Sequence, residues 1–257
     1  MALRETSVRP QQPWLIRWEI FAVFAVSLGA SALNALLSLI GSLLSKQSLA
    51  SQQATLVGPE ATNNWLDLAL QLATIAELVA PVVLVLYLFA RNDEPLSSIG
   101  LDPSQPGKDA ARGAVLAALI GGAGLAFYVL AFKLGYSLNV VPEDLPAVWW
   151  RIPVLVLYAF ANGMLEETLV IGYLLTRLDQ LGVRPWVAVL ASALLRGCYH
   201  LYQGFGAFLG NGALGLIFGV LFRRWRRVTP FIIAHTLIDA GAFVGYAALH
   251  GKVSWLP

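Results

Sequence analysis

Two adjacent carboxylates interrupt an otherwise apolar stretch that is long enough to cross a lipid bilayer. The stretch covers residues 152–175, and Glu166 and Glu167 are its only charged side chains. A membrane-spanning helix needs about 20 apolar residues, and a charge near the bilayer centre costs about 2.5–3.5 kcal/mol on insertion scales. Two neighbouring carboxylates at that depth require protons, a water-filled cavity or partners on other helices, so we treat them as functional candidates.

The composition indicates that the whole chain is a membrane protein. Of its 257 residues, 58% are hydrophobic and 12% are charged, which is about half the charged share of soluble domains. Seven apolar segments can be marked, at residues 18–44, 66–90, 111–132, 149–176, 185–202, 205–222 and 230–249. We therefore predict an all-α, polytopic membrane helix bundle with about 7–8 transmembrane helices. Cys198 is the only cysteine, which excludes a disulfide framework.

The Lys and Arg residues are divided unequally between the two sets of loops. Twelve precede the first segment or follow the second, fourth and sixth: Arg4, Arg9, Arg17, Arg91, Lys108, Arg112, Arg177, Arg184, Arg223, Arg224, Arg226 and Arg227. Four lie on the other side: Lys46, Lys133, Arg151 and Lys252. Because cytoplasmic loops are enriched in Lys and Arg, we predict a cell-membrane protein with a cytoplasmic N-terminus and an external C-terminus.

Four further polar side chains inside the apolar segments can meet the two glutamates. Arg196 and His200 are four residues apart in the fifth segment, and His235 and Asp239 are four apart in the seventh. Residues at this spacing share one helix face. Counting about 1.5 Å per residue from each cytoplasmic helix end gives depths between roughly 8 and 21 Å in a core about 30 Å thick. These depths permit the side chains to converge.

Two chemistries are compatible with these residue types. A glutamate in a low-dielectric cavity can take a proton from water and return it to a leaving amine, while histidines polarise a carbonyl or stabilise an oxyanion. Alternatively, Glu166, His200, His235 and Asp239 form a plausible zinc set with an open position for water. The HExxH signature of helical zinc proteases is absent, so the motifs do not choose between the two.

Three motifs together resemble a known family. The EE pair in the fourth segment, a histidine late in the fifth and an HxxxD in the seventh are similar to the CPBP family of CAAX-type prenyl endopeptidases and bacteriocin-processing proteins. The family pattern is EExxxR, then FxxxH, then HxxxN or HxxxD. The resemblance spans residues 149–249, and Gly172 and Tyr173 after the first motif also fit.

The resemblance implies an intramembrane endopeptidase that hydrolyses a peptide bond through glutamate-activated water. It assigns Glu166 as the general base and Glu167 as its supporting carboxylate. His200, His235 and Asp239 would line the catalytic cavity. Prenylated CAAX proteins are the substrates that name the family, so we expect membrane lipid and a membrane-associated or prenylated substrate as partners, and no nucleic acid.

Two positions depart from the family pattern. The family's arginine falls at Ile171, and the family's phenylalanine falls at Arg196. An arginine at position 171 would lie four residues from Glu167 and could pair with it along the helix. We therefore predict that Arg196 supplies the same charge from the neighbouring helix and pairs with Glu167.

The same sequence allows two other functions. The missing arginine at position 171 favours a non-catalytic relative that acts as a membrane scaffold, binding or immunity protein. Buried carboxylates and histidines also occur in transporters and proton relays, although the internal repeats typical of transporters are not evident. By the resemblance, we divide the chain into a cytoplasmic tail (residues 1–17), N-terminal helices and loops (18–148), a catalytic helix core (149–250) and a short C-terminal tail (251–257).

Overall fold

The computed structural model describes residues 12–249 and residue 252. Helices α1 to α9 account for most of these residues, together with two short strands, three 3₁₀ turns and one π-helical stretch. The elements are α1 Pro13–Ala25, α2 Leu28–Leu44, η1 Leu49–Ser51, β1 Gln53–Val57, α3 Asn64–Arg91, η2 Leu96–Ile99, α4 Pro106–Lys133, β2 Asn139–Glu143, α5 Arg151–Glu166, the π-helical η3 Glu167–Tyr173, α6 Leu174–Gln180, α7 Pro185–Tyr199, η4 Leu201–Gln203, α8 Phe205–Trp225 and α9 Thr229–Leu249.

Several helices begin where the sequence predicts a start. Pro185 is the first residue of α7, and Pro153 and Pro230 lie in the first turns of α5 and α9, where the missing N–H of proline costs least. The side chain of Asn63 caps α3 by accepting hydrogen bonds from the backbone of Trp65 and Leu66. Local sequence signals therefore set these helix boundaries.

The apolar helices confirm the predicted class, a polytopic helical membrane protein. Five helical runs are long and apolar enough to span a bilayer: α3, α4, the continuous run from α5 to α6, α8 and α9. The bent pair α1 and α2 can count as a sixth span, whereas α7 is shorter. In the run from α5 to α6, 72% of the apolar window is buried inside the protein, against 28% or less in the other four. The helix that carries the two glutamates is thus the centre of the bundle.

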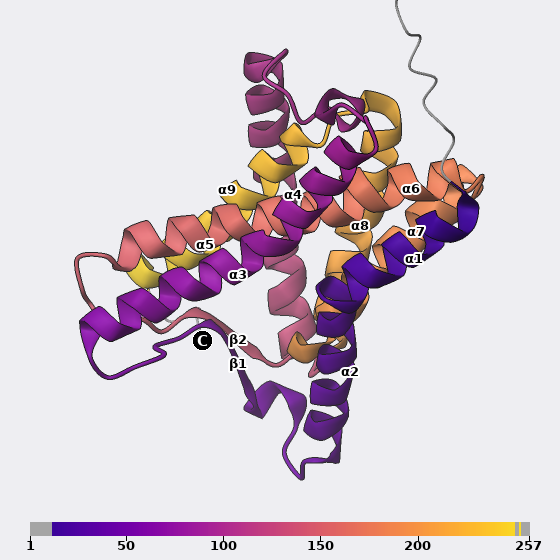
Figure 1. Ribbon diagram of the computed structural model, residues 1–257. Coiled ribbons are helices and arrows are strands. Elements are labelled where there is room, and N and C mark those ends of the chain that lie inside the picture. Colours follow the sequence, from indigo (N-terminus) through magenta and orange to yellow (C-terminus); the bar gives the residue numbers. More distant parts are fainter. Residues whose placement is uncertain (1–11, 250–251, 253–257) are drawn as a thin grey trace, which may run out of the picture.

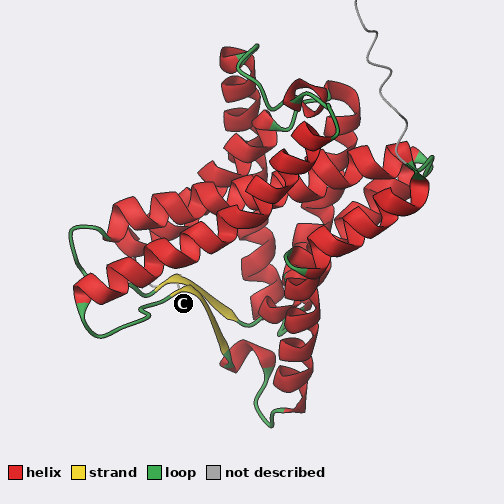
Figure 2. Ribbon diagram, viewed as in Figure 1, coloured by secondary structure: helices red, strands yellow, loops and turns green. Residues whose placement is uncertain are grey.

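The packing of the helices surrounds this central run. In Figure 1, α3, α5 and α9 lie alongside one another, and contacts join α5 to both α3 and α9. α4 packs on α9, α7 packs on α8, and α2 packs on α7. Figure 2 shows that helices dominate the described part of the chain, with one small sheet drawn below α3 and α5. In that sheet β1 and β2 pair in parallel, which joins two loops that lie far apart in the sequence.

The first predicted segment, residues 18–44, is not one straight helix. The chain bends by 50° between α1 and α2. At the bend the hydroxyl of Ser27 donates a hydrogen bond to the backbone carbonyl of Val23, 2.6 Å away, and serine bonds of this kind favour helix bending. Gly29 follows, and a side chain there would press against the carbonyl of Phe24. The single continuous helix expected from hydropathy alone is therefore corrected to a bent pair.

A buried arginine joins three of the helices at one end of the bundle. Arg177 in α6 has no exposed side-chain surface, although the sequence placed it in a loop. Its guanidinium lies 2.7 Å from Glu19 in α1 and 2.7 Å from Glu94 after α3. Because a buried charge is tolerated only with partners, the two carboxylates fix α1 and the end of α3 against α6.

Candidate active site

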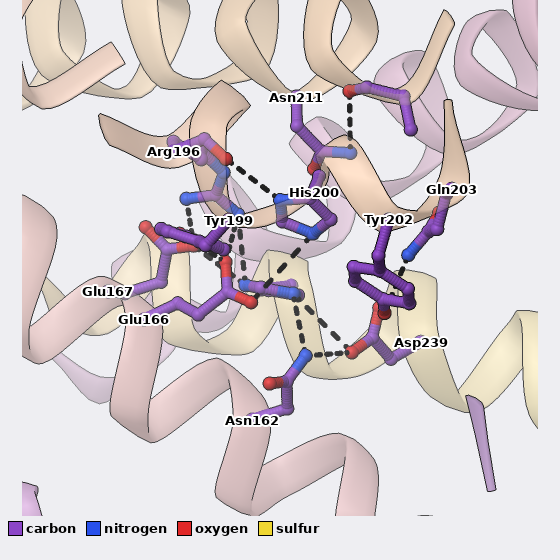
Figure 3. A network of polar contacts seen from close by, with 12 residues as sticks. Asn162, Glu166, Glu167, Arg196, Tyr199, His200, Tyr202, Gln203, Asn211 and Asp239 are labelled. Carbon is purple, nitrogen blue, oxygen red and sulfur yellow. Dashed lines mark hydrogen bonds and ion pairs between the residues drawn. The ribbon is translucent and has the colours of Figure 1, made fainter. Parts of the chain in front are cut away.

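The predicted polar residues converge from three parts of the fold. Glu166 is the last residue of α5 and Glu167 the first of the π-helical stretch η3. Arg196 and Tyr199 lie in the last turn of α7, and His200 follows it. His235 and Asp239 lie on α9, and Figure 3 shows the resulting network. A π-helical stretch is rare and often marks a functional site.

A close approach of α5 to α9 makes this convergence possible. Gly163 lies one turn before the glutamates, and a Cβ atom there would come within 2.8 Å of the Thr236 hydroxyl. Only glycine leaves room for the two backbones at this crossing. The short distance brings the last turn of α5 against His235 and Asp239.

Glu167, Arg196 and His235 form the deeply buried half of the site. Arg196 Nη1 donates to Glu167 Oε1 at 2.7 Å, and neither side chain has any exposed surface. Nδ1 of His235 lies 2.7 Å from the same carboxylate oxygen and 3.2 Å from Arg196 Nη2. The shorter distance indicates that Nδ1 carries a proton and donates it to Glu167. The predicted pairing of Arg196 with Glu167 is therefore present.

The two carboxylate oxygens of Glu166 have different surroundings. Oε2 accepts a hydrogen bond of 2.7 Å from the Tyr199 hydroxyl and lies 3.3 Å from Arg196 Nη2. No side chain in the described part of the chain donates a hydrogen bond to Oε1, which faces His200 Nε2 at 4.0 Å. One oxygen is thus anchored, while the other is available to a substrate or to water.

The ring of His200 is oriented by the main chain. Its Nδ1 lies 2.9 Å from the backbone carbonyl of Arg196. Because a carbonyl oxygen only accepts hydrogen bonds, Nδ1 must donate. In the neutral ring Nε2 is then an acceptor, directed at Glu166.

Asp239 and Asn162 complete the site beside His235. Asp239 Oδ2 lies 3.4 Å from His235 Nε2, and Asn162 Nδ2 donates to the same oxygen at 2.9 Å. Asn162 Nδ2 also lies 3.5 Å from His235 Nε2. His235 is therefore flanked by Glu167 at one nitrogen and by Asp239 at the other.

A large cavity opens onto one side of this cluster. It has a volume of about 1100 Å³ and is lined mainly by apolar side chains of α2, α3, α4, α5, α8 and α9. Glu166, His200, His235 and Asp239 line it, whereas Glu167 and Arg196 do not. The structure thus divides the predicted residues into four that face the cavity and two that lie behind them.

The donor set for a metal differs from the predicted one. Among the described residues, the donor atoms of Glu166, Glu167 and His235 lie within 4.8 Å of one another, whereas the predicted zinc set was Glu166, His200, His235 and Asp239. Arg196 already contacts all three members of the observed group. A cation there would have to compete with the guanidinium charge, so the arrangement does not fit a metal and we derive no step through one.

Sequence reasoning missed two residues of the site. Tyr199, next to His200, donates to Glu166. Asn162, four residues before Glu166, donates to Asp239. Asn162 is four residues from Glu166 and therefore lies on the same helix face, which the sequence could have indicated. The direction of the Tyr199 side chain depends on how α7 packs.

The comparisons agree with the motif pattern. Residues 148–241 match the family model described as type II CAAX prenyl endopeptidase Rce1-like. The matched range contains every predicted site residue and confirms the resemblance to the CAAX-protease family. Comparison with curated proteins and with solved structures gave no significant match. At the level of the family, the match indicates a multi-pass intramembrane protease.

Proposed function

We propose that this chain, whose residues 148–241 match the family model described as type II CAAX prenyl endopeptidase Rce1-like, hydrolyses a peptide bond inside the membrane by glutamate-activated water. One observation carries the proposal: Glu166 Oε1 faces His200 Nε2 across 4.0 Å at the wall of a cavity of about 1100 Å³. Both atoms accept hydrogen bonds, so they can orient a water molecule through its two hydrogens and leave its lone pairs free for attack.

In the proposed reaction, Glu166 acts first as a base and then as an acid. Oε1 takes one proton from the water while the oxygen attacks the carbonyl carbon of the scissile peptide bond. The tetrahedral intermediate then breaks its C–N bond, and Glu166 returns the proton to the leaving nitrogen. The products are a carboxylic acid and an amine, and the enzyme ends in its starting protonation state.

Two side chains of α7, Arg196 and Tyr199, keep this carboxylate in place. Arg196 contacts both Glu166 and Glu167, so its charge is shared between a reacting group and a supporting one. Tyr199 fixes Glu166 Oε2, which leaves Oε1 toward the substrate. A reacting group held in one geometry lowers the entropic cost of the reaction. Arg196 therefore takes over the role that the family pattern gives to an arginine at position 171.

The cavity supports a lipidated or membrane-associated peptide as the substrate. Its volume lies slightly above the range of about 300–1,000 Å³ common for small-molecule sites, which suits an apolar chain together with a short peptide. The wall of the cavity is mainly apolar, so the lipid chain of such a substrate can enter without removing water from charged groups. We propose a prenylated protein or peptide, in agreement with the family description.

The distribution of Lys and Arg supports a cytoplasmic N-terminus in the cell membrane. Cysteine labelling tests this orientation in a Cys198→Ala background. In sealed membranes, Lys108→Cys should react with an impermeant maleimide only when the reagent reaches the cytoplasmic side. Lys46→Cys should react only when the reagent reaches the external side. Labelling of both residues from one side would contradict the proposed orientation.

Cleavage assays on purified protein in nanodiscs test the activity. A farnesylated CAAX peptide and a library of membrane-extracted peptides would be incubated with wild type, Glu166→Gln and Glu77→Gln. Glu77 is a matched control because it is a glutamate in an apolar helix, α3, that does not line the cavity. We expect loss of cleavage by at least about 100-fold in Glu166→Gln, the size of general acid–base catalysis, and retention in Glu77→Gln. Full cleavage by folded Glu166→Gln would refute the mechanism.

A further inference from the structure

Asn162 is a polar residue of the site that belongs to none of the three motifs. It lies on α5, one turn before Glu166, and lines the same cavity. In the segment at residues 152–175 an amide side chain at membrane depth is costly unless it is hydrogen-bonded. The contacts of Asn162 indicate what the amide is for.

The amide of Asn162 has a defined orientation. Its nitrogen lies 2.9 Å from Asp239 Oδ2, and an ionised carboxylate can only accept hydrogen bonds, so the NH₂ group must face it. Figure 3 shows the nitrogen directed at Asp239 and the amide oxygen turned away. Asn162 is therefore the donor of this hydrogen bond and Asp239 is the acceptor.

The bond links α5 to the histidine on α9. Asp239 Oδ2, which accepts the hydrogen bond from Asn162, lies 3.4 Å from His235 Nε2. His235 Nδ1 in turn lies 2.7 Å from Glu167 Oε1. A continuous chain of polar contacts therefore runs from Asn162 through Asp239 and His235 to Glu167, and it begins and ends on the same helical run as Glu166.

We infer that Asn162 is a positioning residue of the proposed peptidase, which holds Asp239 against His235 Nε2 and so keeps the His235 ring turned toward Glu167. The inference rests on the proposed function for its effect on turnover, but the orientation of the ring is a property of the resting protein. Mutation of a side chain that orients a metal-bound histidine through a hydrogen bond changes activity by about 10–100-fold, and we expect the same range for a side chain that orients His235. Asn162 contributes in this way without touching Glu166.

The first experiment separates positioning from stability. Asn162→Leu keeps the volume of the side chain and removes the donor. We expect kcat on a cleaved peptide to fall about 10–100-fold, with KM within about threefold and an unchanged fraction of folded protein. Asn34→Leu is the control, because Asn34 is an exposed asparagine on the apolar helix α2 and lies outside the cavity. A loss that merely follows the folded fraction, or no loss at all, would overturn the inference.

A reciprocal exchange tests the contact itself. Asn162→Asp places two carboxylates together, and we expect at least the loss of Asn162→Leu. The double variant Asn162→Asp with Asp239→Asn restores a donor and an acceptor with the bond reversed. We expect it to return to within about threefold of Asp239→Asn alone, because coupled residues are not additive. A double variant as impaired as the sum of the two single variants would exclude the pairing.

A spectroscopic measurement decides the inference even if no peptide is cleaved. The chain has three histidines, so ¹⁵N-imidazole spectra can be assigned with His200→Gln and His250→Gln. Asn162→Leu should shift the Nδ1 and Nε2 resonances of His235 and leave His250 unchanged, and Asn34→Leu should shift neither. Unaltered His235 resonances in Asn162→Leu would refute the positioning role. Absence of cleavage by wild type would count against the proposed function alone.

Discussion

Arg196 and Glu167 form an ion pair between neighbouring helices, with 2.7 Å between Nη1 and Oε1 and no exposed surface on either side chain. The related family pattern carries its arginine on the glutamate helix, at the position of Ile171. Here Ile171 is fully buried, and the charge comes from α7. The same carboxylate is thus paired, although its partner belongs to another element.

Replacing Arg196 alone should destabilise the protein more than replacing Arg196 and Glu167 together. Removing one partner of a buried ion pair lowers the free energy of unfolding by about 3–5 kcal/mol, because the other charge remains buried without a partner. We expect Arg196→Met to lower the free energy of unfolding by about that amount, and Arg196→Met with Glu167→Gln to recover a substantial part of it. Thermal or denaturant unfolding in detergent measures both. Arg224→Met is the control, since Arg224 is exposed, and a double variant less stable than Arg196→Met would contradict the pairing energy.

Returning the arginine to the family position tests whether its location can be exchanged. Arg196→Phe creates the family's FxxxH motif, and Ile171→Arg creates EExxxR. We expect Arg196→Phe alone to lose folded protein and cleavage, and the double variant to regain part of both, because an arginine at 171 is four residues from Glu167. Expression level and cleavage rate are the readouts. If Arg196→Phe alone retained both, Arg196 would not be the substitute for the family's arginine.

Removal of the Tyr199 hydroxyl should slow turnover. The hydroxyl donates to Glu166 Oε2 at 2.7 Å, and a hydrogen bond to a charged group contributes about 1.5–3 kcal/mol. We expect Tyr199→Phe to reduce kcat about 10- to 100-fold. Tyr87→Phe is the matched control, because Tyr87 is 59% exposed on α3. Equal cleavage by the two variants would show that Glu166 needs no anchor at Oε2.

The ion pair between Asp102 and Arg227, two residues outside the membrane-spanning helices, should be sensitive to acid. Hydrogen bonds from Ser104, and then the charge of Arg227, lower the pKa of Asp102 below its ordinary value of 3.8. A carboxylate with a lowered folded-state pKa stabilises the protein above its unfolded-state pKa, and this contribution is lost as the pH falls through the folded-state value. Acidification below about pH 4 should therefore loosen the Asp102–Arg227 contact.

Hydrogen exchange across residues 96–104 measures this effect. We expect faster exchange at pH 3 than at pH 5, after correction for the intrinsic rate, and a smaller difference in Asp102→Asn. Arg227 also contacts Asp109, at 2.6 Å, so Arg227→Met should raise exchange at both pH values. An unchanged pH difference in Asp102→Asn would assign the acid response to other groups.

The sequence alone determined the class of the protein and predicted most residues of the candidate site. Hydropathy is a property of consecutive residues, so the apolar segments and the helices that start at Pro185 and near Pro230 could be read directly. Charged side chains inside apolar segments are costly, which is why Glu166, Glu167 and Arg196 were evident as candidates. The pairing of Arg196 with Glu167 was predicted from the resemblance, because the family's arginine is absent at position 171, and from charge balance, because a buried cation needs an anion.

Only the tertiary structure decided which atoms face which. The close crossing of α5 and α9 at Gly163 and the burial of the run that carries Glu166 depend on contacts between helices that no single segment encodes. These contacts direct Tyr199 to one oxygen of Glu166 and Asn162 to Asp239, and they place Arg196 behind the cavity instead of within it. Spacing along a helix gives the face of a residue, but packing fixes the distances on which the chemistry depends.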